Sequence, residues 1–99
     1  MVKINWTEIS IEDLKEIHEY IAEDSFRYAE ITIIKIYKQA QILTDYPKSG
    51  KIVPEFNDKS IRELISGNYR IVYKITSKNQ VDILRIYHSS RLLKKNQLK

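Results

Sequence analysis

Residues 61–88 read IRELISGNYRIVYKITSKNQVDILRIYH, and the fold class follows from this stretch. It holds three runs rich in β-branched and aromatic residues, at positions 61–65, 69–76 and 81–87. In the middle run, tyrosine and isoleucine occupy every second position from 69 to 75, with arginine, valine and lysine between them. This alternation is typical of a strand whose two faces meet different surroundings.

The short gaps between the three runs favour tight turns. Ser66-Gly67-Asn68 suits a hairpin because glycine and asparagine tolerate a positive φ. Ser77-Lys78-Asn79-Gln80 has the composition for a second hairpin. We therefore predict that residues 61–87 form a three-stranded antiparallel meander.

Two amphipathic helices are predicted upstream of the meander. Thr7 or Ser10 can cap the first helix, and Asp24-Ser25 interrupts the pattern and can cap a second helix. Almost no linker separates the two, which favours an antiparallel helical hairpin. In each helix, apolar residues recur at steps of three and four and so share one face: Ile11, Leu14, Ile17 and Ile21, then Ala29, Ile33, Ile36, Ala40 and Leu43.

The remaining segments complete an α+β order. Residues 2–6 alternate as a short opening strand, and Pro47 and Gly50 begin a loop expected to reach about residue 60. The basic tail, residues 89–99, is expected to form a short helix or to fray. The order strand, helix, helix and three strands predicts a single domain, residues 1–99. In it, the helical hairpin packs on one face of a small twisted antiparallel sheet.

Composition limits the setting of this domain. Ninety-nine residues provide one modest core, and the absence of cysteine excludes disulfides and thiolate metal sites. No apolar run suits a signal peptide or a membrane span, which predicts a soluble cytoplasmic protein. Residues 1–30 hold eight acidic and three basic side chains, a net of −5, whereas residues 31–99 hold fourteen basic and five acidic, a net of +9. This asymmetry indicates either a face for a polyanion or an acidic partner, or an unevenly charged solvated surface.

Short motifs along the chain resemble those of one known family. They are Trp6-Thr7, Asp13-Leu14, Tyr20-Ile21-Ala22-Glu23-Asp24-Ser25, Tyr46-Pro47 with Gly50, Val53-Pro54-Glu55, Arg62-Glu63-Leu64, Gly67-Asn68-Tyr69-Arg70-Ile71-Val72-Tyr73 and Ile83-Leu84-Arg85-Ile86-Tyr87-His88-Ser89-Ser90-Arg91. No single motif is specific. As an ordered set covering nearly the whole chain, they resemble the RelE/ParE toxins.

The resemblance implies the toxin of a bacterial type II toxin–antitoxin pair, neutralised by a co-expressed antitoxin protein. Members of the RelE branch cleave messenger RNA in the ribosomal A site. Members of the ParE branch inhibit DNA gyrase and usually lack a nuclease site. Of the three functions open to the chain, ribosome-dependent RNA cleavage is preferred over gyrase inhibition and over an inactive relative that only binds its antitoxin. The free toxin is either a monomer or a homodimer.

Three residues predict a nuclease site that needs no metal and no cofactor. Glu55 matches a glutamate that acts as base in some nuclease members, and His88 suits the general acid because histidine changes charge near neutral pH. Arg70 suits the clamp on the scissile phosphate. Each has a structural alternative: a solvated loop carboxylate for Glu55, an ion pair with Asp82 or Glu63 for Arg70, and a strand-end hydrogen bond for His88.

Further contacts to RNA are predicted at four positions. Arg62, Arg91 and Lys51 would bind phosphates, and Tyr87 would stack on an unpaired base. The alternatives are ordinary surface charges and a core tyrosine. Ser89 follows the histidine where some nuclease members carry an aromatic residue, so that role is vacant unless Tyr87 fills it.

Overall fold

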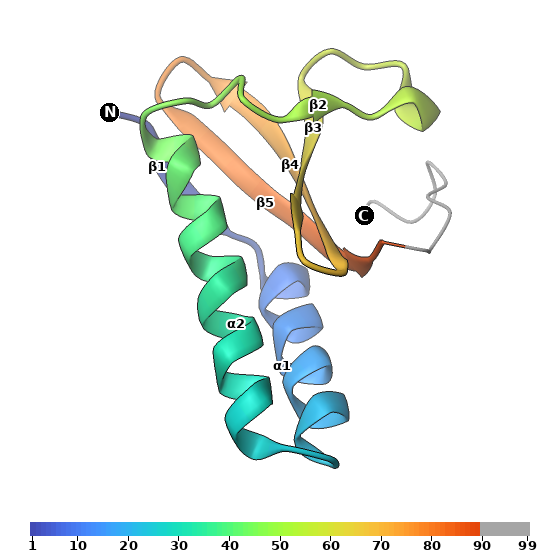
Figure 1. Ribbon diagram of the computed structural model, residues 1–99. Coiled ribbons are helices and arrows are strands. Elements are labelled where there is room, and N and C mark those ends of the chain that lie inside the picture. The colour runs from blue at the N-terminus through green and yellow to red at the C-terminus, as the bar shows by residue number, and fades with distance from the viewer. Residues whose placement is uncertain (90–99) are drawn as a thin grey trace.

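The structure is a computed structural model and describes residues 1–89. Its elements are β1 (Lys3–Trp6), α1 (Glu8–Ala22), α2 (Phe26–Gln41), the 3₁₀ turn η1 (Ile42–Thr44), β2 (Lys51–Ile52), the 3₁₀ turn η2 (Pro54–Phe56), β3 (Ile61–Ser66), β4 (Tyr69–Ser77) and β5 (Gln80–His88). Figure 1 shows the two helices side by side against the sheet. The predicted α+β architecture is confirmed, while the prediction for the tail lies outside the described residues from position 90 onward.

The sheet has five strands in the order β1-β5-β4-β3-β2. The meander of β3, β4 and β5 is antiparallel as predicted, but β1 runs parallel to β5, with Lys3 beside Gln80 and Trp6 beside Ile83. The expectation of a wholly antiparallel sheet was therefore wrong, and the sheet is mixed. Alternation along a strand defines its two faces but does not define the direction of a neighbour far away in the sequence.

The loop predicted between Gly50 and residue 60 contains two short elements. Strand β2 pairs antiparallel with β3 through Lys51 and Ile52, and η2 follows it directly. Two residues are too few for a periodic pattern to be visible in a sequence. The short strand forms the edge of the sheet beyond β3 and fixes the start of the loop.

Local chemistry sets the ends of the helices and the turn between β3 and β4. Thr7 caps α1 by accepting the backbone N–H of Ser10, and Ser25 caps α2 by accepting that of Tyr28. Gly67, at a φ of 59°, begins the two-residue turn between β3 and β4. None of the helices in residues 1–89 combines the length and apolar character needed to cross a membrane.

The main core lies between α2 and the sheet. Its buried residues are Ile36, Ala40, Leu43, Leu64, Ile71, Tyr73, Val81, Ile83 and Ile86. Burying one such aliphatic side chain is worth roughly 1.5–3 kcal/mol, so this layer holds the helices onto the sheet. Trp6 packs against the same cluster and stacks on Tyr37 of α2, with ring centroids 6.1 Å apart.

A second, smaller core covers part of the opposite face of the sheet. Val53 and Phe56, from the segment around η2, pack on Val72 of β4 and Tyr87 of β5, and Ile61 borders them. All four central residues are at most 5% exposed. This face, on which Arg70 lies, is therefore partly closed by the segment that carries Glu55.

Candidate functional site

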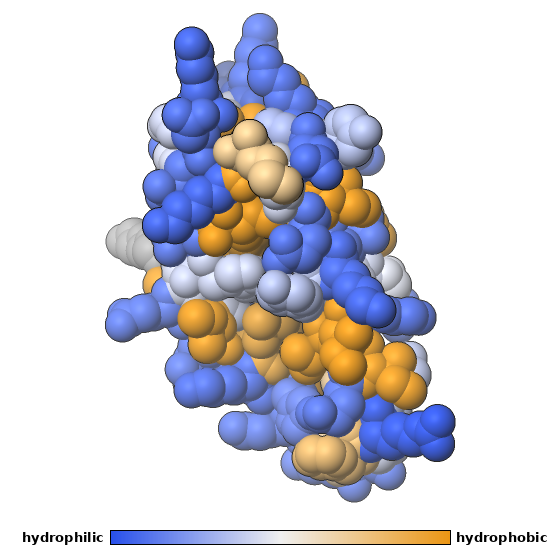
Figure 2. Space-filling model, turned by 90° about the vertical axis from the view of Figure 1, so that its left-hand side faces the viewer, coloured by the Kyte–Doolittle hydropathy of each residue, from blue (hydrophilic) through white to orange (hydrophobic). Residues whose placement is uncertain are grey.

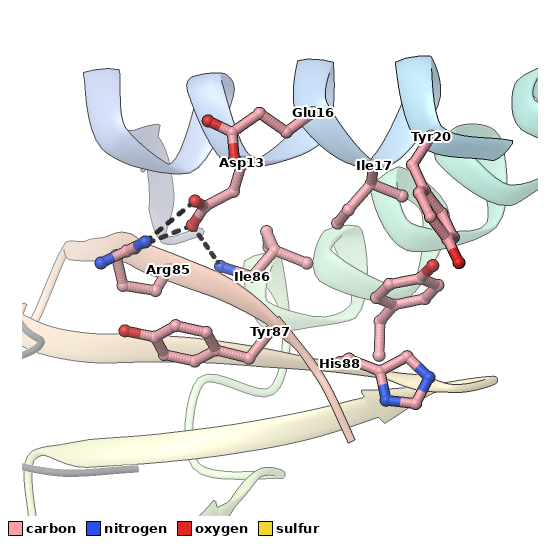
Figure 3. A pocket seen from close by; sticks show the side chains of 9 residues that line it. Asp13, Glu16, Ile17, Tyr20, Arg85, Ile86, Tyr87 and His88 are labelled. Carbon is pink, nitrogen blue, oxygen red and sulfur yellow. Dashed lines mark hydrogen bonds and ion pairs between the residues drawn. The ribbon is translucent and has the colours of Figure 1, made fainter. Parts of the chain in front are cut away.

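Side chains at the start of α1 occupy the outer edge of β5 where β1 ends. Thr7 Oγ1 donates to the carbonyls of Ile83 and Leu84 at 2.7 and 3.3 Å. Further along the helix, Asp13 Oδ2 accepts the backbone N–H of Ile86 at 2.9 Å. These bonds satisfy backbone groups that a longer β1 would otherwise have paired. As a result, α1 is attached directly to the edge of a strand (Figure 3).

Asp13 also forms a two-pronged ion pair with Arg85. The guanidinium donates from Nε to Oδ2 at 2.8 Å and from Nη2 to Oδ1 at 3.0 Å. These bonds to Asp13 raise the pKa of Arg85, outweighing the partial burial that lowers it. The guanidinium carbon also lies 4.9 Å from the centre of the Tyr87 ring. Arg85 is therefore held in place from two sides.

A pocket of about 490 Å³ opens beside this ion pair, between α1 and the ends of β4 and β5. Asp13 and Arg85 lie at one end of it, and Tyr20 and His88 lie at the other (Figure 3). The His88 ring packs edge-on against Tyr69, with centroids 5.6 Å apart. The pocket therefore has a charged end and an aromatic end, and a bound molecule could contact both.

Tyr69 connects this pocket to the helical hairpin. Its side chain also lines a smaller cavity of about 150 Å³ with Tyr28 and Thr32 of α2. Burial raises the pKa of Tyr69, and the neighbouring phenols of Tyr20 and Tyr28 raise it further. The Tyr69 phenol, neutral at physiological pH as tyrosine ordinarily is, provides an uncharged aromatic wall to both cavities.

On the opposite face of the sheet, Arg70 is bound by two carboxylates. It donates to Glu63 from Nε at 2.6 Å and from Nη2 at 2.8 Å, and its Nη2 lies 3.8 Å from Glu55 Oε2. The Arg70 side chain is 11% exposed and that of Glu63 is 7% exposed. The hydrogen bonds to Glu63 raise the pKa of Arg70 against the effect of burial. The ion pair with Glu63, which was the structural alternative for Arg70, is thus formed.

The structure brings Glu55 and Arg70 together but places His88 elsewhere. In the register of β4 and β5, Arg70 lies beside Tyr87 and Tyr69 lies beside His88. Successive side chains on a strand point to opposite faces, so His88 shares the helix-covered face with Tyr69. Arg70 shares the other face with the small core. The catalytic roles of Glu55, Arg70 and His88 stay predictions, and the three side chains do not converge in this structure.

Arg62 binds the loop after η1, whereas its predicted role requires a side chain that is exposed to phosphate. Its Nη1 donates to the carbonyls of Lys48 and Gly50 at 3.2 and 2.9 Å. Tyr73 completes the arrangement, because its hydroxyl donates to Pro47 O at 2.7 Å and accepts the N–H of Gly50 at 3.0 Å. A Cβ atom on Gly50 would lie 2.5 Å from that hydroxyl, so only glycine fits.

Comparison with known proteins identifies the family. The family model described as "ParE toxin of type II toxin-antitoxin system, parDE" matches residues 4–93. The chain belongs to the ParE toxin family. This confirms the resemblance to RelE/ParE toxins.

Individual relatives of this ParE-family toxin agree with that assignment. Toxin RelE2 of Caulobacter vibrioides is 27% identical over 92 residues, covering 93% of this chain and all of the relative. A chain of the chromosomal ParDE system from P. aeruginosa has the same fold, with a TM-score of 0.74 and 22% identity over 89% of this chain and 96% of that chain. A chain of the toxin–antitoxin complex RelBE2 from Mycobacterium tuberculosis gives a TM-score of 0.63 and 21% identity over 88% and 96%.

The remaining predicted RNA contacts of this ParE-family toxin differ in how exposed their side chains are. Lys51 is exposed on the edge strand β2, where a phosphate can reach it. Tyr87 is 3% exposed and lies in the small core, which matches its structural alternative. Arg91 lies outside the described residues.

Sequence reasoning missed the residues that build the pocket of the ParE-family toxin. Asp13 and Arg85 were noticed only as parts of motifs. Glu63, on the opposite face of the sheet, was noticed as part of a motif and as an alternative partner for Arg70. One signal was available for Asp13, because it lies on the same helical face as Ser10, Leu14 and Ile17, where a carboxylate needs a partner. The identity of that partner, 72 residues away, depends on the pairing of β1 with β5.

Proposed function

We propose that this toxin of a type II toxin–antitoxin system stops growth by binding its target and does not cleave RNA. The target proposed is DNA gyrase, as the resemblance to the ParE branch implies. The observation that carries the proposal is the state of Arg70. Its guanidinium already makes two hydrogen bonds to Glu63, and a second carboxylate, Glu55, lies 3.8 Å away.

Charge around Arg70 disfavours a phosphate. One guanidinium and two carboxylates give the cluster a formal charge of −1, if both acids are ionised. A scissile phosphate would meet this negative charge and would have to displace Glu63, which is 7% exposed. Displacing one partner of such a pair leaves a buried charge unpaired, which costs on the order of 3–5 kcal/mol. Binding of the scissile phosphate to Arg70 would therefore be strongly disfavoured.

The separation of acid and base supports the same proposal. In-line cleavage by attack of a 2′-hydroxyl needs a base at the attacking oxygen and an acid at the departing oxygen of one phosphate. Glu55 lies on the face of the small core, whereas His88 shares the helix-covered face with Tyr69. The sheet separates the two groups, so they do not reach one phosphate in this arrangement.

A second candidate is the ribosome-dependent endoribonuclease, with Glu55 as base, Arg70 as phosphate clamp and His88 as acid. The closeness of Glu55 to Arg70 favours it, because a base and a clamp must lie near each other. This candidate requires the ribosome to reorganise the end of β5 so that His88 joins the other two.

A cognate antitoxin is the partner proposed for either activity. The two structural relatives come from a ParDE system and from a RelBE2 toxin–antitoxin complex. The basic balance of residues 31–99, a net of +9, suits an acidic antitoxin segment that folds as it binds. A complex with a basic wrapping segment would contradict that expectation.

Two assays on one set of proteins test the proposal. The wild type, Glu55→Gln and His88→Gln are compared in DNA supercoiling by purified gyrase and in primer extension on messenger RNA with purified ribosomes. We expect all three to inhibit supercoiling and none to cleave RNA. Ribosome-dependent cleavage lost in either variant would overturn the proposal in favour of the nuclease. Failure of a folded, antitoxin-binding wild type in both assays, without growth arrest in cells, would indicate an inactive relative.

A further inference from the structure

The outer face of α2 is apolar at its centre although it faces solvent. Ile31 is 40% exposed, Ile34 is 51% exposed and Tyr37 is 52% exposed. Figure 2 looks onto the side of the molecule where α2 lies in Figure 1, and shows orange side chains gathered among blue ones over the helices. Exposed large side chains are common singly, but three on one helical face form a continuous surface.

Charges lie on both sides of this apolar centre, and their order has a symmetry. Glu30, Ile34 and Lys38 are spaced four residues apart and therefore form one ridge along α2. The ridge reads acidic, apolar, basic. Among helix packings, the common arrangement at about −50° sets such ridges of two helices alongside one another. If the second ridge runs in the opposite direction, each Glu30 meets a lysine and the two Ile34 side chains meet at the centre.

We propose that the free protein forms a homodimer through α2, with the two helices antiparallel and the two-fold axis at Ile34. Glu30 then lies opposite Lys38 of the partner subunit, and the same contact occurs again across the axis. Ile31 and Tyr37 flank Ile34 three residues away on either side and complete the apolar centre. Two copies of the ridge place opposite charges together only when they run antiparallel, since a parallel pairing would place like charges together.

Lys38 and one carboxylate oxygen of Glu30 are available for this interface. Lys38 is exposed and, within residues 1–89, forms no salt bridge. Glu30 Oε2 is bonded to Nε2 of His18 at 2.6 Å, but Oε1 makes no hydrogen bond in the described part of the chain. Tyr37 is fixed from beneath by its stack on Trp6, which keeps its outer face in position. The aromatic part of the surface is therefore held in place before a second copy arrives.

Charge exchange provides the test. The proteins are Glu30→Lys, Lys38→Glu and the double variant that carries both changes, each synthesised in a cell-free system and followed by sedimentation over a range of concentrations. We expect a concentration-dependent dimer for the wild type and about tenfold weaker association for each single variant, because like charges then meet twice. The double variant restores the opposite-charge contacts and should return to the wild-type dissociation constant. A mixture of the two single variants should form a heterodimer.

Three controls keep the outcome interpretable. Circular dichroism establishes that each variant is folded, which is important for Glu30→Lys because it also loses the contact with His18. Lys35→Glu changes the charge equally but lies off the ridge, so its association should match the wild type. Ile34→Asp should abolish the dimer.

Two results would overturn the proposal. One is a wild type that stays monomeric at every concentration. If Ile34→Asp then also prevents capture by the cognate antitoxin, the apolar surface of α2 binds the antitoxin and not a second copy. The other is a double variant that associates no better than the single ones.

Discussion

Asp13 holds two groups of β5 at once, since its Oδ2 accepts both Arg85 Nε at 2.8 Å and the backbone N–H of Ile86 at 2.9 Å. The carboxylate thus connects the first helix to the last strand of the described chain. It accepts a backbone N–H that a neighbouring strand would otherwise bond, and it also forms the ion pair with Arg85.

Replacing Asp13 with alanine should lower the free energy of unfolding by about 2–4 kcal/mol, because it leaves Arg85 and a strand N–H without their partner. Urea denaturation measures the change. Glu16→Gln is the matched control, since Glu16 lines the same pocket and makes no hydrogen bond within residues 1–89. Equal stability of the two variants would show that the Asp13 contacts are not stabilising.

Gly50→Ala should destabilise the protein by about 1–3 kcal/mol, the usual cost of forcing extra atoms into a packed site. The new methyl would lie 2.5 Å from the Tyr73 hydroxyl and 2.7 Å from Glu63 O, and the second of these is backbone that cannot move aside easily. Gly67→Asn is the comparison, because the φ of 59° suits asparagine and a Cβ there meets no atom within 4 Å. Thermal unfolding should show a clear loss for position 50 and a small one for position 67.

Stability should decrease as the pH rises above about 10, and Tyr73 contributes to that decrease. Burial raises the pKa of Tyr73, outweighing the Gly50 N–H and Arg62, which lower it. With a raised folded-state pKa, the folded protein retains the proton where the unfolded chain has lost it. The stabilisation is therefore complete below the unfolded pKa and is lost as the pH rises through the folded one.

The variant that isolates this effect is Tyr73→Phe. It should be about 1–3 kcal/mol less stable at neutral pH, since Pro47 O and the N–H of Gly50 lose their partner. Its stability should also fall less steeply above pH 10 than that of the wild type. The measurement is a series of denaturation curves from pH 7 upward, and parallel curves for the two proteins would exclude a role for this phenol.

Glu63→Gln should destabilise the fold more than Glu55→Gln. Glu63 is 7% exposed and bonds Arg70 at 2.6 and 2.8 Å, whereas the Glu55 side chain is 26% exposed and lies 3.8 Å from it. The first change should cost about 1–3 kcal/mol and the second less than about 1 kcal/mol. Chemical denaturation of both variants would decide, and a reversed order would mean that Glu55 is the principal partner of Arg70.

Elements with a strong local signal were predicted correctly from the sequence. Ser25 caps α2 as expected, and Gly67 forms the turn that the Ser66-Gly67-Asn68 motif predicted. These features depend on backbone propensities of a few neighbouring residues. The three runs of the meander also matched β3, β4 and β5 within one residue at each end, because their periodicity extends over several residues.

The site was harder to predict because it depends on long-range pairing. The neighbour of β5 on its outer edge is β1, and that pairing alone brings Asp13 to Arg85. Likewise, the side of the sheet on which His88 lies depends on its register with Tyr69. A one-residue change of register would have moved it to the face of Arg70. Charge type and spacing in a sequence carry no information about register.

The parallel pairing of β1 with β5 also affects how the chain is made. Lys3 lies beside Gln80, so 76 residues are translated between the two partners. At ribosomal speeds of about 5–20 residues per second, the opening strand waits roughly 4–15 s for its neighbour. Throughout that interval the apolar faces of both helices lack β5, which supplies Val81, Ile83 and Ile86 to the core. A nascent chain interrupted before β5 therefore lacks these three core side chains and the partner strand of β1, and the complete fold forms only after β5 has left the ribosome.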